Sequence, residues 1–138
     1  MGIKFSGIGH VAIRCKNFEE EYEFYTKVLG FKKILDIYDE NGEAWITYLR
    51  VKKKQYIELF HRTESHPQEN YIGKNEEVYR SPYKVIFEVW NRKDFFTRIK
   101  NDTNLEKLVD IENNLSNCLD DVKIIRDPEG NGYNLVSL

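Results

Sequence analysis

Two matching positions in the sequence carry ionisable side chains that could do chemistry. The strand-like segment IGHVAIRC (8–15) places His10 where the similar segment PYKVIFEV (82–89) places Lys84. An imidazole can bind a metal ion, whereas a lysine ammonium offers three N–H donors and no acceptor. The repeat therefore puts two different chemistries on equivalent strand positions.

Arg14 and Glu88 follow His10 and Lys84, respectively, at the same even spacing. Because side chains alternate between the two faces of a strand, Arg14 is expected on the face of His10 and Glu88 on the face of Lys84. Arg14 could bind a carboxylate or phosphate of a substrate. An ion pair between Arg14 and Glu88 is an equally good alternative.

The remaining candidates for chemistry are weaker. His61 follows Glu58 by three residues, so on a strand it faces away from Glu58 and is expected to be a surface histidine. His66 lies in a polar stretch and is expected to be solvated, although segments over a cleft can contact ligands. Cys15 has no identifiable base in the sequence, which argues against a thiol nucleophile.

The elements that must position these residues follow one order twice, strand–helix–strand–strand–strand. In the first half, alternating apolar residues and helical spacing predict a strand, a helix and three strands at 8–15, 17–28, 31–38, 44–51 and 56–60. The second half repeats this order less clearly, with a strand, a helix and three strands predicted at 83–90, 93–101, 105–112, 122–126 and 133–138. Residues 113–121 show no pattern that assigns them.

The repeat predicts an α+β protein in which residues 1–138 form a single domain of two modules. The first module spans residues 1–60 and the second spans residues 82–138. Between them, residues 61–81 are polar and lack periodicity, which is typical of a linker. A hydrophobic content of 41% suits one core in a chain of this length.

The helix predicted at 17–28 has recognisable signals at both ends and along one face. Asn17 is the expected N-cap, and three glutamates follow in the first turn, where carboxylates favour the helix dipole. Gly30 is expected to end the helix in the left-handed conformation. Helical spacing of large side chains predicts a buried stripe made of Phe18, Tyr22, Tyr25 and Leu29.

The composition excludes several kinds of partner. A net charge of −2 and a pI of about 6.0 give no electrostatic footprint for nucleic acid. No apolar run is long enough for a membrane helix, so no membrane partner is expected. The two cysteines, Cys15 and Cys118, do not make a disulfide framework, and a cytoplasmic location is expected.

Four segments of the chain resemble one known superfamily. They read GHVAI at 9–13, FYTKVLGF at 24–31, YIELF at 56–60 and DPEGNGYNLV at 127–136. These segments are similar to motifs of the vicinal-oxygen-chelate superfamily. That superfamily includes glyoxalase I, extradiol dioxygenases and bleomycin-resistance proteins. The resemblance covers nearly the whole chain. It implies a glyoxalase/bleomycin-resistance-like fold, in which two βαβββ modules have curved mixed sheets that form a cupped, ligand-binding cleft.

The resemblance also implies where a metal would bind. Carried over by position, metal ligands fall on His10 and Glu58, and Glu58 would also be the catalytic residue. The other two ligand positions fall on Lys84 and Asn134, which are not the residue types of a metal-using member. The ammonium of Lys84 would oppose a metal ion and would pair with Glu58 instead. A cleft without a metal cofactor is therefore predicted, and a divalent ion (Zn, Ni, Co, Fe or Mn) held by His10 and Glu58 is the alternative.

These features favour a small-molecule-binding protein of the glyoxalase/bleomycin-resistance type with a degenerate metal site. Its expected ligand contacts are Arg14, Lys84, Glu88 and Asn134. A metal-dependent glyoxalase-like lyase (lactoylglutathione lyase-like) or isomerase that uses His10 and Glu58 is the first alternative. A sensor or interaction module that has lost the site is the second. The expected partners are a small-molecule ligand and a second copy of the chain in a homodimer.

Overall fold

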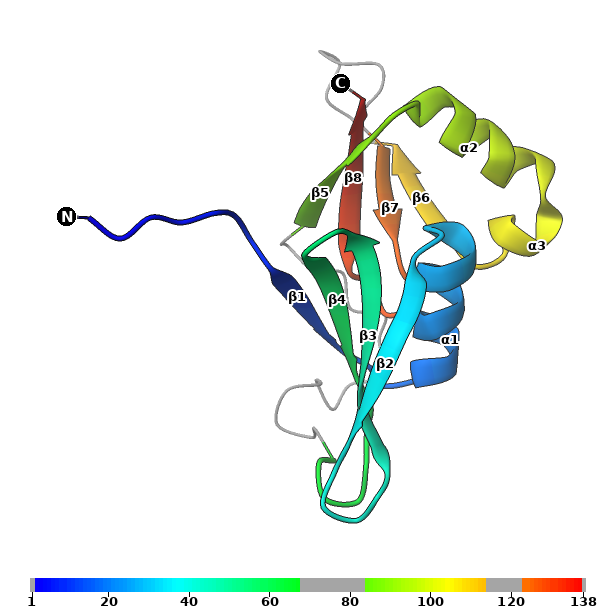
Figure 1. Ribbon diagram of the computed structural model, residues 1–138. Coiled ribbons are helices and arrows are strands. Elements are labelled where there is room, and N and C mark those ends of the chain that lie inside the picture. The colour runs from blue at the N-terminus through cyan, green and yellow to red at the C-terminus, as the bar shows by residue number, and fades with distance from the viewer. Residues whose placement is uncertain (1, 68–83, 114–122, 138) are drawn as a thin grey trace. The chain divides into compact units, whose positions relative to one another are not determined.

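The computed structural model of the chain describes residues 2–67, 84–113 and 123–137, which form two four-stranded sheets and their helices (Figure 1). The chain divides into two compact units. Unit 1 comprises Met1–Phe18 and Gly30–Lys74, and unit 2 comprises Glu19–Leu29 and Asn75–Leu138. The first helix therefore belongs almost entirely to unit 2, although it follows the first strand of unit 1.

The sheet of unit 1 is mixed and has the strand order β1-β4-β3-β2. Its strands are β1 (His10–Arg14), β2 (Lys32–Tyr38), β3 (Ala44–Lys52) and β4 (Gln55–Phe60). β1 runs parallel to β4, and the other neighbours are antiparallel. One face buries apolar side chains such as Ile13, Leu49 and Leu59. The opposite face carries His10 and Glu58, so the alternation of residues decides which side of the sheet can hold a site.

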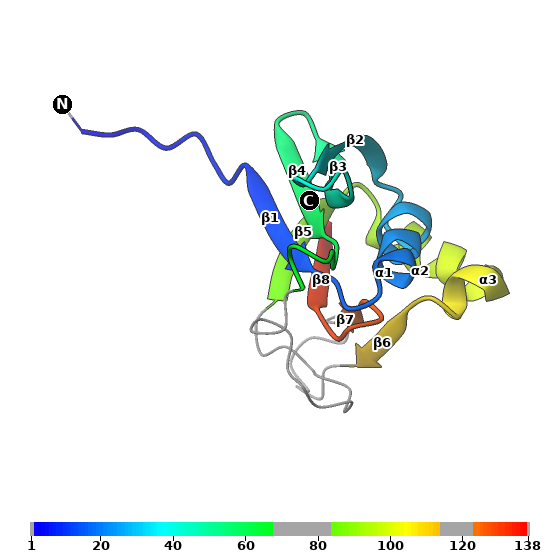
Figure 2. The same cartoon turned by 90° about the horizontal axis from the view of Figure 1, so that it is seen from below.

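Residues 2–9 precede β1 as an extended arm that leads away from the strand (Figures 1 and 2). The predicted strand therefore starts two residues later than expected, at His10. The apolar side chains of the arm, Ile3, Phe5 and Ile8, are 87%, 90% and 77% exposed. Exposed apolar side chains of this kind are available for contact with another molecule.

The helix predicted at 17–28 is present, but its second half is a π-helix. It consists of α1 (Phe18–Glu23) and η1 (Phe24–Val28), and Gly30 follows with φ = 77°, as expected for a left-handed stop. The predicted buried stripe is largely wrong, because only Tyr25 of its four members is fully buried. The side chains that the helix buries are Glu21, Phe24, Tyr25 and Val28. The face that the helix buries is thus rotated relative to the predicted one.

The sheet of unit 2 repeats the mixed pattern, in the order β5-β8-β7-β6. Its strands are β5 (Lys84–Val89), β6 (Asp110–Asn113), β7 (Lys123–Arg126) and β8 (Gly132–Ser137). Two helices, α2 (Arg92–Asn101) and α3 (Thr103–Glu106), follow β5. The order βαβββ therefore occurs twice, and the predicted α+β class with two mixed sheets is confirmed.

Most predicted strands agree with the observed ones to within two residues at each end. The strand predicted at 105–112 is wrong in its first half, because residues there form α3 and β6 starts only at Asp110. The side chain of Asp102 caps α3 by accepting hydrogen bonds from the N–H groups of Asn104 and Leu105, at 2.9 and 3.3 Å. The unassigned segment 113–121 lies outside the described residues from residue 114 onward. Of the helices that the structure describes, none has the length and apolar character needed to cross a membrane.

Candidate functional site

His10 and Glu58 are in direct contact on the exposed face of the unit 1 sheet. The parallel register of β1 and β4 pairs His10 with Tyr56 and Ala12 with Glu58, which places both side chains on one face. The Nδ1 atom of His10 bonds to Oε1 of Glu58. The side chain of His10 is 44% exposed and that of Glu58 is 15% exposed. The imidazole is thus open to a ligand while the carboxylate lies beneath it.

Two tyrosines surround the imidazole. The rings of Tyr48 and Tyr56 each lie 5.4 Å from the ring of His10 in edge-on contact, and 6.3 Å from each other. Burial, the charge of Glu58 and a hydrogen bond to that carboxylate together raise the pKa of Tyr48. Tyr48 therefore keeps its proton and donates a hydrogen bond to Glu58. The carboxylate is thus held by a phenol as well as by the imidazole.

Arg14 lies at the other end of the same face. It pairs in register with Phe60, and its guanidinium carbon lies 5.2 Å from the centre of the Phe60 ring. The expected role of Arg14 in binding an acidic group of a ligand stays a prediction. The predicted ion pair between Arg14 and Glu88 joins residues of different units and stays a prediction.

The remaining predicted site residues lie on two neighbouring strands of unit 2, the edge strand β5 and the central strand β8. In backbone register, Lys84 pairs with Gly132, Ile86 with Asn134 and Glu88 with Val136. Asn134 is 5% exposed. The predicted convergence of Lys84 and Asn134 with His10 and Glu58 on one cleft stays a prediction.

The His10–Glu58 pair supplies two ligand atoms for the divalent metal that the resemblance implies. Metal sites in proteins commonly use three or four protein ligands. Among the described residues, ligand atoms of three or more His, Cys, Asp or Glu side chains lie within 4.8 Å of one another only at Asp39, Glu40 and His66. The surroundings of the pair therefore fit a metal incompletely, and the pair is a hydrogen-bonded imidazole and carboxylate in its own right.

His61 faces away from Glu58, as predicted, but it is not a free surface histidine. Its Nε2 atom lies 2.6 Å from the hydroxyl oxygen of Thr47, and that hydroxyl donates to Asp36 at 2.6 Å. Because the hydroxyl has one proton, Nε2 must be the donor to Thr47. The ring also stacks on Phe18 at 3.5 Å between centres. Burial acts to raise the pKa of Asp36, but hydrogen bonds from Lys33 and Thr47 outweigh it and lower that pKa.

His66 is likewise half-buried rather than solvated. Its ring stacks on Trp45 with 4.1 Å between centres and 12° between planes. No sequence pattern indicates this contact, because Trp45 lies near the start of β3 whereas His66 lies in the segment after β4. Cys15 is fully buried and bonds to the carbonyl of Ile13, in agreement with its assignment as unreactive.

A buried polar cluster in unit 2 was not predicted at all. Glu21 is fully buried and accepts a hydrogen bond from the N–H of Glu129 at 3.1 Å. Tyr25 donates to Asp127 at 2.7 Å and, having one proton, must accept from Tyr133. Burial first, and then the neighbouring Asp127, raise the pKa of Glu21 from 4.5 to about 11. The signal available in the sequence is the spacing of Glu21 and Tyr25, which puts them on one helix face.

Comparison with solved structures relates this fold to several small-molecule-binding proteins and enzymes. TnmS3, an antibiotic binding protein from Streptomyces sp. CB03234, is 14% identical with a TM-score of 0.64, over 99% of this chain and 98% of that chain. Lactoylglutathione lyase from Agrobacterium tumefaciens is 19% identical with a TM-score of 0.63, over 97% and 95%. A mutant of the fosfomycin resistance protein FosX from Listeria monocytogenes, complexed with Mn(II) and 1S,2S-dihydroxypropylphosphonic acid, is 12% identical with a TM-score of 0.65, over 96% and 92%.

The sequence itself was compared with curated proteins and with family models. No curated protein matches the chain at a significant level. A model of the Glyoxalase/Bleomycin resistance protein/Dioxygenase superfamily matches residues 7–135, which is nearly the whole chain. Together with the two βαβββ orders and the mixed sheets, this match identifies the chain as a member of the Glyoxalase/Bleomycin resistance protein/Dioxygenase superfamily.

Proposed function

We propose that this protein binds a small molecule on the face of the unit 1 sheet that carries His10 and Glu58. The supporting observation is the group that these two side chains form with Tyr48, in which an exposed imidazole lies over a hydrogen-bonded carboxylate beside an aromatic ring. Aromatic walls with a few fixed polar groups are typical of small-molecule sites.

The side chains of this face favour a ligand with an apolar or aromatic body and one polar group. Leu35 and Ile37 lie on the same face of β2 and are 46% and 38% exposed. Tyr56 adds a second ring beside His10. A polar group of the ligand would bond to His10 or Glu58. TnmS3, which is similar in fold, is described as an antibiotic binding protein, and this is a function of the same kind.

In this proposal the second module completes the site. We propose that Lys84 is the charge partner of Glu58, and that Glu88 and Asn134 contact the ligand together with Arg14. The ammonium takes the role of a charge partner for a partly buried carboxylate, which otherwise loses solvation without compensation. Lys84→Ala is therefore expected to weaken ligand binding.

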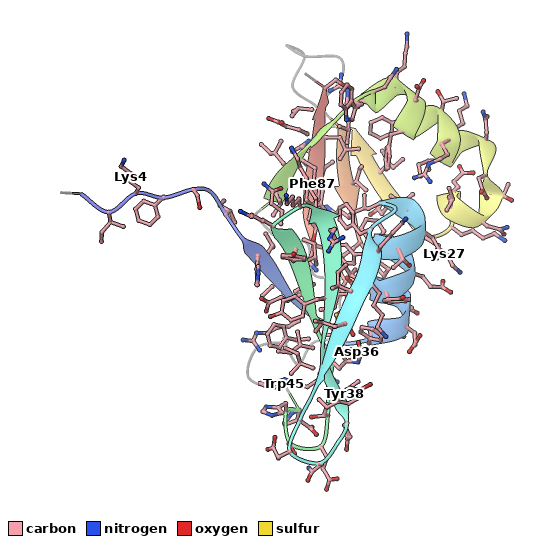
Figure 3. All side chains as sticks on the ribbon, viewed as in Figure 1. Lys4, Lys27, Asp36, Tyr38, Trp45 and Phe87 are labelled. Atoms are coloured by element: carbon pink, nitrogen blue, oxygen red, sulfur yellow. The ribbon has the colours of Figure 1, made fainter. Side chains whose placement is uncertain are left out.

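The test is a thermal-shift screen of aromatic small molecules, followed by calorimetry on the full chain. Tyr56→Ala removes one ring beside His10 and is expected to lower affinity about tenfold. Tyr38→Ala is the matched control, because Tyr38 is another exposed tyrosine and lies at the hairpin end of β2 (Figure 3). Equal affinity of the Tyr56→Ala variant and the wild type for every ligand found would refute this placement of the site.

A metal-dependent lyase or isomerase is the second candidate, because Nδ1 of His10 and Oε1 of Glu58 converge as two ligand-type atoms. The assay is formation of lactoylglutathione from methylglyoxal and glutathione after addition of Zn²⁺, Ni²⁺, Co²⁺, Fe²⁺ or Mn²⁺. Metal-dependent turnover that Glu58→Gln abolishes would replace the binding proposal with this one. Turnover that survives Glu58→Gln would point to metal bound elsewhere on the chain.

A further inference from the structure

A second cluster of ligand-type side chains lies where β2 and β3 join, within unit 1. Asp39 and Glu40 follow the end of β2, and His66 comes from the segment after β4. One ligand atom from each of the three side chains lies within 4.8 Å of the other two. Tyr38 and Trp45 mark this hairpin end of the sheet in Figure 3. The cluster is separate from the His10–Glu58 pair and uses none of its residues.

The turn holds the carboxylate of Asp39 in place. Its Oδ1 atom accepts hydrogen bonds from the N–H groups of Asn41 and Glu43, at 2.9 and 3.0 Å. Its carbonyl accepts from the N–H of Gly42 at 3.0 Å, and Gly42 has φ = 77°, which suits glycine. One carboxylate oxygen thus fixes the turn, and Oδ2 takes no part in these hydrogen bonds.

The imidazole of His66 is fixed from two sides. The backbones of Thr63 and His66 exchange hydrogen bonds of 3.1 and 3.2 Å, and the His66 N–H also donates to the Thr63 hydroxyl at 3.0 Å. The ring is stacked on Trp45. Its Nε2 atom lies 3.4 Å from Oε2 of Glu40. Ring orientation fixed by neighbours is what metal-binding histidines commonly have.

Two atoms of this cluster lack the partners that buried polar atoms normally have. Oδ2 of Asp39 and Nε2 of His66 are both shielded from solvent and have no hydrogen-bond partner among the described residues. A carboxylate oxygen and a ring nitrogen without hydrogen-bond partners thus belong to one compact cluster.

We propose that Asp39, Glu40 and His66 bind a divalent first-row transition ion of the Zn²⁺ type. Two carboxylate oxygens and one imidazole nitrogen are a donor set that suits such an ion, with water in the remaining positions. The ion would satisfy Oδ2 and Nε2 and would draw in the more exposed Glu40. It would also join the segment at 63–66 to the β2–β3 hairpin. The competing state is a protonated His66 that forms an ion pair with both carboxylates.

The test uses the tryptophan that stacks on the ligand. The chain has two tryptophans, so Trp90→Phe leaves Trp45 as the reporter. Titration of chelator-treated protein with Co²⁺ or Cu²⁺ should quench Trp45 fluorescence, and calorimetry with Zn²⁺ should give one site. Glu40→Gln should weaken binding about tenfold or more, and His66→Gln should abolish the quenching.

Two controls locate the ion. Glu43→Gln removes an exposed carboxylate from the same turn without touching the cluster and should leave binding unchanged. His10→Ala should also leave it unchanged, because the imidazole of the other face takes no part. Quenching that is lost in His10→Ala, or retained in His66→Gln, would overturn the proposal. So would a failure of the wild type to bind Zn²⁺ at millimolar concentration.

Discussion

Replacing Glu21 with Gln should change the pH dependence of stability more than any other conservative substitution on this helix. Glu21 is fully buried, the N–H of Glu129 bonds to it, and the carboxyl group of Asp127 lies nearby. Burial is the main reason that its pKa rises from 4.5 to about 11 in the folded chain. The folded protein therefore holds a protonated acid at neutral pH, whereas the unfolded chain releases that proton near pH 4.5.

The sign and the size of the effect follow from this difference. A group whose pKa is raised by folding contributes fully below its unfolded pKa, and that contribution is lost as pH rises toward the folded pKa, here between 4.5 and about 11. Each pH unit in this window lowers the free energy of unfolding by about 1.4 kcal/mol. Between about pH 5.5 and about pH 8 the loss is therefore about 3 kcal/mol. Glutamine has a similar shape and does not titrate, so Glu21→Gln should not show this loss.

The assay is urea denaturation of the wild type and the variant at several pH values in this range. The difference in free energy of unfolding between Glu21→Gln and wild type should grow steadily in favour of the variant as pH rises. Glu19→Gln is the control, because Glu19 is exposed in the first turn of the same helix, and this variant should follow the wild type. Parallel curves for Glu21→Gln and wild type would mean that Glu21 ionises inside the folded protein, and the reasoning from burial would be wrong.

Three further outcomes are expected. The double substitution Lys84→His and Asn134→Glu should raise the affinity for Zn²⁺, Ni²⁺ or Co²⁺, measured by calorimetry. His66→Gln is included in both proteins compared, so that the cluster at Asp39 and Glu40 does not contribute. No gain in affinity over His66→Gln alone would contradict the predicted ligand positions. The protein should be a homodimer, so light scattering at micromolar concentration should give about twice the chain mass of 16.5 kDa, and a value near the chain mass itself would exclude this. Thr47→Val should lower the free energy of unfolding by about 1–3 kcal/mol, because it removes the buried hydroxyl that bridges the partly buried Asp36 and His61, whereas Thr97→Val at an exposed position should change it little.

The sequence predicted best what depends on neighbours along the chain. The family resemblance placed His10 with Glu58, strand alternation placed His61 on the other face, and the register of β1, β3 and β4 agrees. This works because one face of the sheet is buried, and a shift of one residue would expose the whole apolar set. The left-handed stop at Gly30 was predicted for a similar local reason, since few other residues adopt that conformation easily.

What was missed depends on contacts between distant parts of the chain. Glu21 looked like a surface carboxylate favouring the helix dipole, but its partner Glu129 is 108 positions away. The stacking of His66 on Trp45 joins the segment after β4 to the start of β3, and no periodicity signals such a contact. The short helix α3 was taken for a strand because Leu105 is apolar in either structure, and only the cap formed by Asp102 decides between them.

The allocation of the first helix to unit 2 has a consequence for how the protein can be divided. The chain leaves unit 1 after Phe18 and returns to it at Gly30. The stretch Glu19–Leu29 therefore belongs to unit 2, although it lies between two segments of unit 1 in the sequence. A fragment ending after β4 would carry Glu21 and Tyr25 without the aspartate and tyrosine that bond to them. The complementary fragment would lack the helix that covers those same groups. Neither half is therefore expected to fold independently. Cleavage of the chain between β4 and β5 should leave two fragments that stay associated or reassociate.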